Sequence, residues 1–125
     1  MNYQRGYVAI LTVLILSAVV VGTMSTAALL SIGEARSGLA LSDGEETLQF
    51  VEGCVDEALL RSRADPNYNG STITVPEGSC LVTISKISVP WTMTVNNTTT
   101  AYQRKIQVQY TRGATGITIS SWKEL

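Results

Sequence analysis

Residues 7–32 read YVAILTVLILSAVVVGTMSTAALLSI, an apolar stretch in the N-terminal third of the chain. No charged residue occurs from Gly6 to Gly33, so 28 consecutive residues are uncharged. As an α-helix they would span about 42 Å, which exceeds the thickness of a bilayer's hydrocarbon core, about 30 Å. We therefore expect residues 7–33 to form a transmembrane helix.

The rest of the composition argues against an enzyme. The 125 residues include 9 Lys and Arg, 10 Asp and Glu, and no His. Without His the chain lacks the commonest general base and metal ligand, and its two Cys cannot form a zinc site alone. No nucleophile–base pair is readable, and we expect no catalytic activity and no cofactor. The net charge of −1 also argues against a nucleic-acid site, which needs a concentrated basic surface.

Beyond Gly33 the pattern remains helical but becomes amphipathic over residues 34–64. Apolar residues recur there at three- and four-residue spacing, while acidic residues and Arg61 occupy the other side. The apolar stripe consists of Leu48, Val51, Val55, Ala58 and Leu59. No Pro occurs between Met1 and Ala64, so one helix from about Tyr7 to about Arg63, some 85 Å long, is expected. It should end at Ala64-Asp65-Pro66, because the residue before Pro avoids the helical conformation.

Residues 65–125 predict an antiparallel sheet. Their apolar and polar residues alternate with a period of two in runs rich in Thr, Val, Ile and Tyr. The expected strands are 72–75, 80–87, 91–97, 101–111 and 116–122. In the fourth run Tyr102, Arg104, Ile106, Val108 and Tyr110 share one face. The predicted fold is therefore α+β, a long N-terminal transmembrane or spine helix packed on a small C-terminal antiparallel sheet.

The apolar stretch also permits a different interpretation, a cleavable signal peptide. Ser25-Thr26-Ala27 before Ala28 is a small-x-small site for a signal peptidase. In either case the short N-terminal tail favours leaving residues 1–6 in the cytoplasm, with the C-terminal domain outside.

The junction at the start of the apolar stretch resembles the processing site of type IV prepilins and pseudopilins. A short basic tail ends in Gln4-Arg5-Gly6, and the aromatic residue Tyr7 opens the apolar helix at once. The resemblance implies that residues 1–6 are a leader peptide. A prepilin peptidase would cut between Gly6 and Tyr7 and methylate the new N-terminus. The fifth mature residue, usually Glu in this family, is Leu11 here. Minor pilins and the tip pseudopilin often lack that Glu, so the departure suggests such a subclass.

The resemblance implies a structural function. The chain would be a minor pilin or pseudopilin of a type IV pilus or a type II secretion-like filament, at the tip or in a priming complex. Its partners would be other pilin subunits through the N-terminal helix, the prepilin peptidase, and membrane lipid before assembly. It would move from the inner membrane to a cell-surface or periplasmic filament. The alternative is a single-pass membrane-anchored or secreted adhesin-like binding module that does not assemble.

The two cysteines, Cys54 and Cys80, lie on the helical stripe and at the start of the second predicted strand. In a domain exported across the membrane they would most simply form a disulfide that joins helix and sheet. Two buried free thiols are the alternative.

Two further sets of residues are candidate sites. Asp65, Asn67 and Asn69, followed by Gly70, match the first half of an EF-hand loop, but the twelfth position is Pro76. This set is a partial calcium motif, and an Asx turn at the helix exit is the alternative. The pairs Arg61/Arg63 and Arg104/Lys105 form either a small basic patch for DNA or a protein partner, or a set of solvated and ion-paired side chains.

Overall fold

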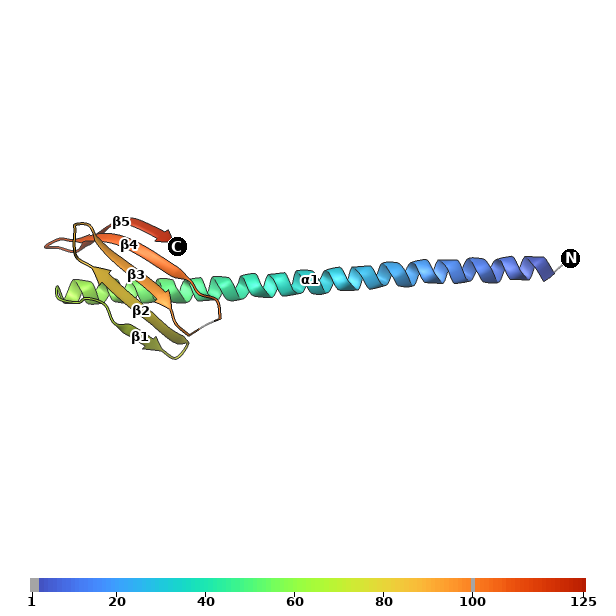
Figure 1. Cartoon of the computed structure of the whole chain (residues 1–125), viewed down its shortest axis with the longest axis horizontal. Helices are drawn as coiled ribbons and strands as arrows, with labels where there is room; N and C mark the ends of the chain where they lie inside the picture. Colours follow the sequence, from blue (N-terminus) through green and yellow to red (C-terminus); the bar gives the residue numbers. More distant parts are fainter. Residues whose placement is uncertain (1–2, 100) are drawn as a thin grey trace. The chain divides into compact units, whose positions relative to one another are not determined.

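The computed structural model describes residues 3–99 and 101–125, with side chains described from residue 6 onward (Figure 1). Helix α1 covers Tyr3–Ala64 and is followed by β1 (Thr72–Val75), β2 (Gly78–Ser85), β3 (Trp91–Asn97), β4 (Lys105–Arg112) and β5 (Ile117–Glu124). The chain divides into two compact units, one up to Leu41 and one from Ser42 to Leu125. The second unit, here called the head, holds the last part of α1 and all five strands. The predicted α+β fold, with a long helix packed on an antiparallel sheet in a pilin-like arrangement, is confirmed.

Helix α1 is continuous because nothing in its sequence interrupts it. It contains no Pro and ends at Ala64, as predicted, where Asp65 precedes Pro66. The backbone N–H of Asp65 still donates to the carbonyl of Arg61 at 2.9 Å, which completes the last turn. The helix begins at Tyr3 rather than at about Tyr7, since no Pro separates these residues from the apolar stretch and one Gly is not enough to end a helix.

The sheet is an antiparallel meander in the order β1-β2-β3-β4-β5. The predicted limits of the first and third strands, residues 72–75 and 91–97, agree with β1 and β3. For the other three strands, the predicted bounds were wrong by two to four residues at one or both ends. The strand β2 begins at Gly78 because Val75 pairs with Gly78 in a tight hairpin, and β5 extends to Glu124, which pairs with Ile106.

The largest error concerns β4, which begins at Lys105 rather than at residue 101. The side chain of Asn97 occupies the backbone groups that a longer strand would use. Its Nδ2 donates to the carbonyl of Tyr102 at 2.8 Å, and its Oδ1 accepts from the N–H of Arg104 at 2.7 Å. Tyr102 and Arg104 therefore precede the strand, and only Ile106, Val108 and Tyr110 of the predicted face are buried.

The core of the head lies between the C-terminal part of α1 and one face of the sheet. Val51, Val55 and Ala58 of the predicted stripe are fully buried, and Leu48 and Leu59 pack at its edges. From the sheet come the alternate residues of the strands, which include Val82, Met93, Val95, Ile106, Val108 and Tyr110. The helix stripe is thus the core partner that the sequence predicts, and the opposite face of the sheet is solvated.

Candidate functional site: an exposed apolar helix and a disulfide-linked head

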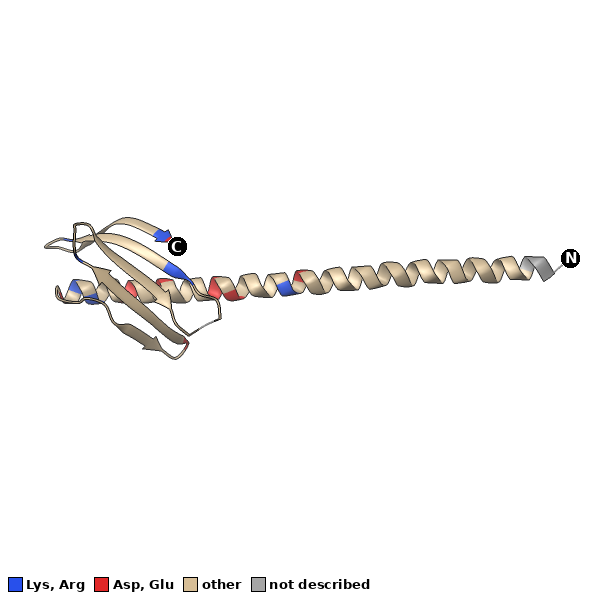
Figure 2. Cartoon of the chain, in the orientation of Figure 1, with Lys and Arg blue, Asp and Glu red and all other residues tan. Residues whose placement is uncertain are grey.

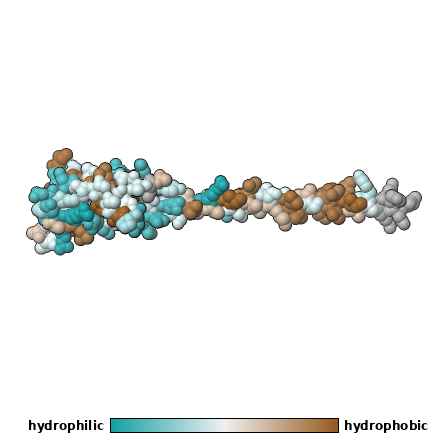
Figure 3. Space-filling view, turned by 90° about the horizontal axis from the view of Figure 1, so that it is seen from below, coloured by the Kyte–Doolittle hydropathy of each residue, from teal (hydrophilic) through white to brown (hydrophobic). Residues whose placement is uncertain are grey.

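The N-terminal part of α1 presents an exposed, uncharged and largely apolar surface. Every large hydrophobic side chain from Tyr7 to Ile32 is at least 40% exposed. Figure 2 shows no charged residue along this part of the helix, and Figure 3 shows hydrophobic residues in brown, interspersed with paler ones, on the visible face. The helix is long and apolar enough to cross a membrane. Such a surface is unfavourable in water, at roughly 25 cal/mol for each Å² of apolar area left exposed, and is stable in lipid or against other helices.

The polar side chains within this surface are compatible with lipid, because the helix itself satisfies their hydrogen-bond donors. Each Ser and Thr hydroxyl from residue 7 to residue 32 donates to a backbone carbonyl three or four positions earlier, at 2.8 to 3.0 Å. The six residues are Thr12, Ser17, Thr23, Ser25, Thr26 and Ser31. Since the bilayer core offers no water, such internal bonding is what a membrane-spanning segment needs.

The candidate processing junction lies inside α1. Tyr7 is 68% exposed, and nothing in the described chain comes within 4 Å of the position that a Cβ on Gly6 would occupy, the neighbouring residues and the local helix backbone aside. The side chain of Arg5, the basic residue of the motif, lies outside the described side chains. Four positions after Tyr7, Leu11 is 40% exposed and presents an aliphatic side chain.

Cys54 of α1 and Cys80 of β2 form a disulfide bond, with their sulfur atoms 2.02 Å apart. Both cysteines are buried, at 4% and 0% exposure, so the bond is part of the core. It joins the helix to the sheet across 26 positions of sequence. The predicted disulfide is therefore present, and the alternative of two buried free thiols is wrong.

The partial calcium motif coincides with the turn that follows α1. The backbone N–H of Asn67 donates to Oδ1 of Asp65 at 2.8 Å, which is an Asx turn. Among residues 3–99 and 101–125, no group of three or more Asp, Glu, Cys or His side chains is placed to hold a metal ion. The turn accounts for Asp65 without a cation, and calcium binding stays an untested prediction.

The two basic pairs lie at different ends of the head. Arg61 forms an ion pair with Glu57 at 2.8 Å, and hydrogen bonding to this carboxylate raises the pKa of the Arg61 guanidinium. Arg104 pairs with Glu124 and lies beside Gly44 of α1. Since Gly44 and Arg61 are separated by about 25 Å along the helix, the four residues do not form one basic patch. The interpretation as ion-paired side chains holds for Arg61 and Arg104.

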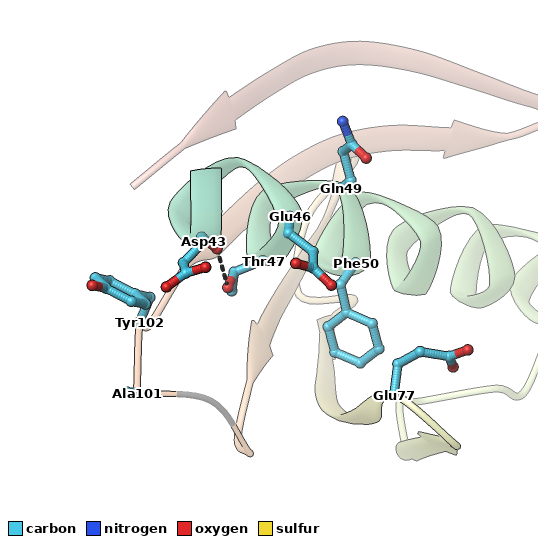
Figure 4. Close-up of a pocket in the computed structure, with 8 residues that line it drawn as sticks. All are labelled: Asp43, Glu46, Thr47, Gln49, Phe50, Glu77, Ala101 and Tyr102. Carbon is cyan, nitrogen blue, oxygen red and sulfur yellow. Dashed lines mark hydrogen bonds between the residues drawn. The ribbon is translucent and has the colours of Figure 1, made fainter. Parts of the chain in front are cut away.

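A hollow of about 580 Å³ lies between α1 and the loops at the end of the sheet nearest Gly44. Figure 4 shows three carboxylates around it, with the ring of Phe50 pointing toward the turn between β1 and β2. Its lining residues are Asp43, Glu46, Thr47, Gln49, Phe50, Glu77, Ala101 and Tyr102. None of the described lining residues is basic. The sequence pattern did not predict that Asp43 and Glu77 line one hollow, because their proximity depends on how the β1–β2 hairpin packs beside the helix.

No protein-family model, no curated protein sequence and no solved structure matches this chain.

Proposed function

We propose that this chain is a membrane-anchored structural subunit of a pilus-like or type II secretion-like filament, of the minor pilin or pseudopilin class. The observation that supports this most is the continuity of α1. One helix carries an exposed, uncharged surface from Gly6 to Gly33 and then continues into the core of the head, where Val51 and Val55 are fully buried. A single element can thus hold the subunit in lipid and join it to a folded domain.

The same apolar surface would serve in two successive environments. Before assembly it is solvated by the lipid of the inner membrane, with the head on the outer side. After extraction it packs against the N-terminal helices of neighbouring subunits, which replace lipid as the apolar surroundings. The Cys54–Cys80 disulfide keeps the sheet attached to the helix during this transfer. The proposed function requires no cofactor and no catalytic residue.

The residue at position 11 favours a position at the filament tip or in a priming complex. In the family, a carboxylate at this position is thought to pair with the N-terminal amine of an adjacent subunit. Leu11 cannot offer that partner. A charge left unpaired in lipid costs about 2.5–3.5 kcal/mol on insertion scales. A shaft built from this chain would bear that cost at every subunit, whereas a tip subunit bears it at most once.

The absence of a carboxylate at Leu11 also favours a second candidate, a membrane-anchored binding module that never assembles. The two functions differ in the fate of the N-terminus, because only the filament subunit needs processing at Gly6. Sequencing the mature N-terminus therefore discriminates between them. We expect a chain that begins with N-methylated Tyr7.

The experiment has a matched control within the same helix. Gly6→Val should block the cut and retain the leader, whereas Gly22→Val, also at a position with open space around its Cβ, should be processed normally. A mature chain that begins at Ala28 would contradict the proposal, because the span would be lost. An intact leader on the wild-type chain in cells that contain an active prepilin peptidase would favour the non-assembling module.

A further inference from the structure

The most exposed hydrophobic side chains of the head lie on the loop between β2 and β3. Ile87 is 95% exposed and Val89 is 70% exposed. The value for Ile87 is the highest of any exposed large hydrophobic residue in the described part of the chain. Neither residue belongs to the membrane-spanning part of α1, so anchoring does not account for their exposure. We call Ile87 and Val89 the apolar tip.

The apolar tip is located where α1 ends. Nζ of Lys86 donates to the carbonyl of Pro66 at 2.8 Å, which holds the β2–β3 loop beside the helix exit. Nη2 of Arg112 donates to the carbonyl of Arg63 at 3.2 Å and brings the β4–β5 loop to the same end. In Figure 1 both loops lie beside the C-terminal end of α1. Three separate segments thus meet around the tip.

The base of the loop is held by packing, while its two aliphatic side chains project into solvent. The ammonium of Lys86 lies 5.0 Å from the centre of the Trp91 ring, a cation–π contact. Trp91 in turn packs edge-on against Tyr110, with ring centres 5.9 Å apart. Ile87 and Val89 are therefore presented from a fixed base, and their docking on a surface would order few additional groups.

The charge around the apolar tip is positive. Lys86 adjoins it in sequence, and Arg63 and Arg112 lie at the same end of α1. These three cations outnumber Asp56 and Asp65, the carboxylates at this end outside the Arg61–Glu57 ion pair. Glu57 is paired with Arg61, and Oδ1 of Asp65 accepts the Asn67 N–H. The hollow at the other end of the head carries three carboxylates instead, and Figure 2 shows Lys and Arg positions in blue at the C-terminal end of α1. The head thus presents cations where it presents its exposed aliphatic residues.

We propose that the apolar tip docks onto an anionic lipid surface presented to the head. Ile87 and Val89 would enter the interfacial region, and the cations at this end of the head would lie among the phosphate groups. Exposed aliphatic residues combined with cations are the composition of interfacial lipid-binding segments. A protein partner would need about 1,000 Å² or more of complementary surface, whereas this tip is a narrow projecting loop. The inference concerns the head alone and does not depend on filament assembly.

Binding is measured with the full chain held in phosphatidylcholine nanodiscs, so that α1 is occupied, by flotation with separate vesicles. Vesicles that contain phosphatidylglycerol should bind the wild-type chain. Ile87→Ser/Val89→Ser should lower the partition coefficient about tenfold or more, a factor that partial burial of two aliphatic side chains supplies. The matched control is Leu81→Ser, which removes another exposed aliphatic residue of the head, on β2, and should bind as the wild type does.

The cationic part of the inference is tested separately. Arg63→Gln should lower binding to anionic vesicles about fivefold, because one Lys or Arg near such a surface contributes about 1 kcal/mol. On pure phosphatidylcholine vesicles the same change should have no effect. Tryptophan fluorescence of each variant during thermal unfolding checks that the head remains folded.

A second readout is independent of the amount bound. In a Trp122→Phe background, vesicles with brominated acyl chains should quench Trp91, which lies next to the loop. Absence of quenching, or equal flotation of the wild type and the Ile87→Ser/Val89→Ser variant, would overturn the proposal. Binding to native membranes but not to pure lipid vesicles would point to a protein receptor and would also overturn it. N-terminal sequencing has no bearing on these results, since a chain that begins at either Tyr7 or Ala28 carries the tip.

Discussion

The hydroxyl oxygens of Ser62 and Tyr110 lie 2.9 Å apart inside the head, although 48 positions separate the two residues in sequence. Ser62 is 1% exposed and Tyr110 is fully buried, so water cannot replace either partner. Ser62 belongs to the last turn of α1 and Tyr110 to β4. This hydrogen bond therefore fixes the end of the helix against the sheet at the same level as Trp91 and the loop that carries Ile87.

Tyr110→Phe should lower the free energy of unfolding of the head by about 1 to 2 kcal/mol, because the Ser62 hydroxyl would remain buried without its partner. Urea denaturation of the full chain in detergent micelles, followed by tryptophan fluorescence, measures this change. Tyr7→Phe is the control, since Tyr7 is exposed and outside the head. Adding Ser62→Ala to Tyr110→Phe should restore part of the loss. Equal stability of Tyr110→Phe and wild type would contradict the prediction.

The head should also become less stable at high pH. Burial raises the pKa of Tyr110 above its ordinary value of 10.0, although the hydrogen bond with Ser62 opposes the rise. Between pH 10 and the raised pKa, the unfolded state binds fewer protons than the folded state, so the free energy of unfolding falls as pH rises. Below pH 10, Tyr110 is protonated in both states, and its full contribution to the free energy of unfolding is present. Unfolding free energies measured across this range should fall more steeply for the wild type than for Tyr110→Phe, and identical slopes would refute the assignment.

Removing the Cys54–Cys80 disulfide should lower the stability of the head, and we expect no catalytic activity to be lost with it. Closure of a loop of this length reduces the entropy of the unfolded chain by an amount worth about 3.5 kcal/mol, usually an upper figure. Cys54→Ala/Cys80→Ala should therefore shift the urea midpoint downward by at most that amount. Mass spectrometry of the exported protein without reductant should find the linked peptides. Free thiols on the folded, exported chain would contradict the prediction.

Much of the fold could be predicted because its signals are local. The uncharged stretch from Gly6 to Gly33, the absence of Pro before Pro66, and the stripe that contains Val51 and Val55 are each readable within one segment. The start of β4 could not be predicted, because the side chain of Asn97 decides it by bonding to Tyr102 and Arg104. The period-two pattern of a strand does not show which backbone groups a side-chain amide five to seven positions away will occupy.

The site was less predictable for the same reason. Gly6, Tyr7 and the two cysteines are recognisable from residue type and position. The apolar tip is not, since Ile87 was assigned to a strand, and its exposure follows from β2 ending at Ser85 when Lys86 turns to bind Pro66. The acidic hollow likewise depends on packing between segments that are remote in sequence. The sequence pattern therefore predicts the long apolar helix and the disulfide, but not the surfaces that the head presents.

A carboxylate at position 11 should change where this subunit is found in a filament. Under the proposed function, Leu11 leaves the N-terminal amine of a neighbouring subunit without a partner, which restricts the wild-type chain to the tip or the priming complex. Leu11→Glu would supply that partner and offset the cost of the buried amine. Elsewhere in the span, an added carboxylate has no amine to pair with and costs about 2.5–3.5 kcal/mol in lipid.

We therefore expect Leu11→Glu to occur more often inside filaments than the wild type, and Leu14→Glu, which adds the same charge at an exposed position one turn away, to be incorporated less. Quantitative mass spectrometry of purified filaments, combined with immunogold labelling of the head, measures both amount and position. A homopolymeric shaft made of the wild-type chain would refute the tip assignment. An unchanged distribution for Leu11→Glu would refute the charge-pairing mechanism even if labelling still places the wild-type subunit at the tip, because the restriction would then arise from the head and not from position 11.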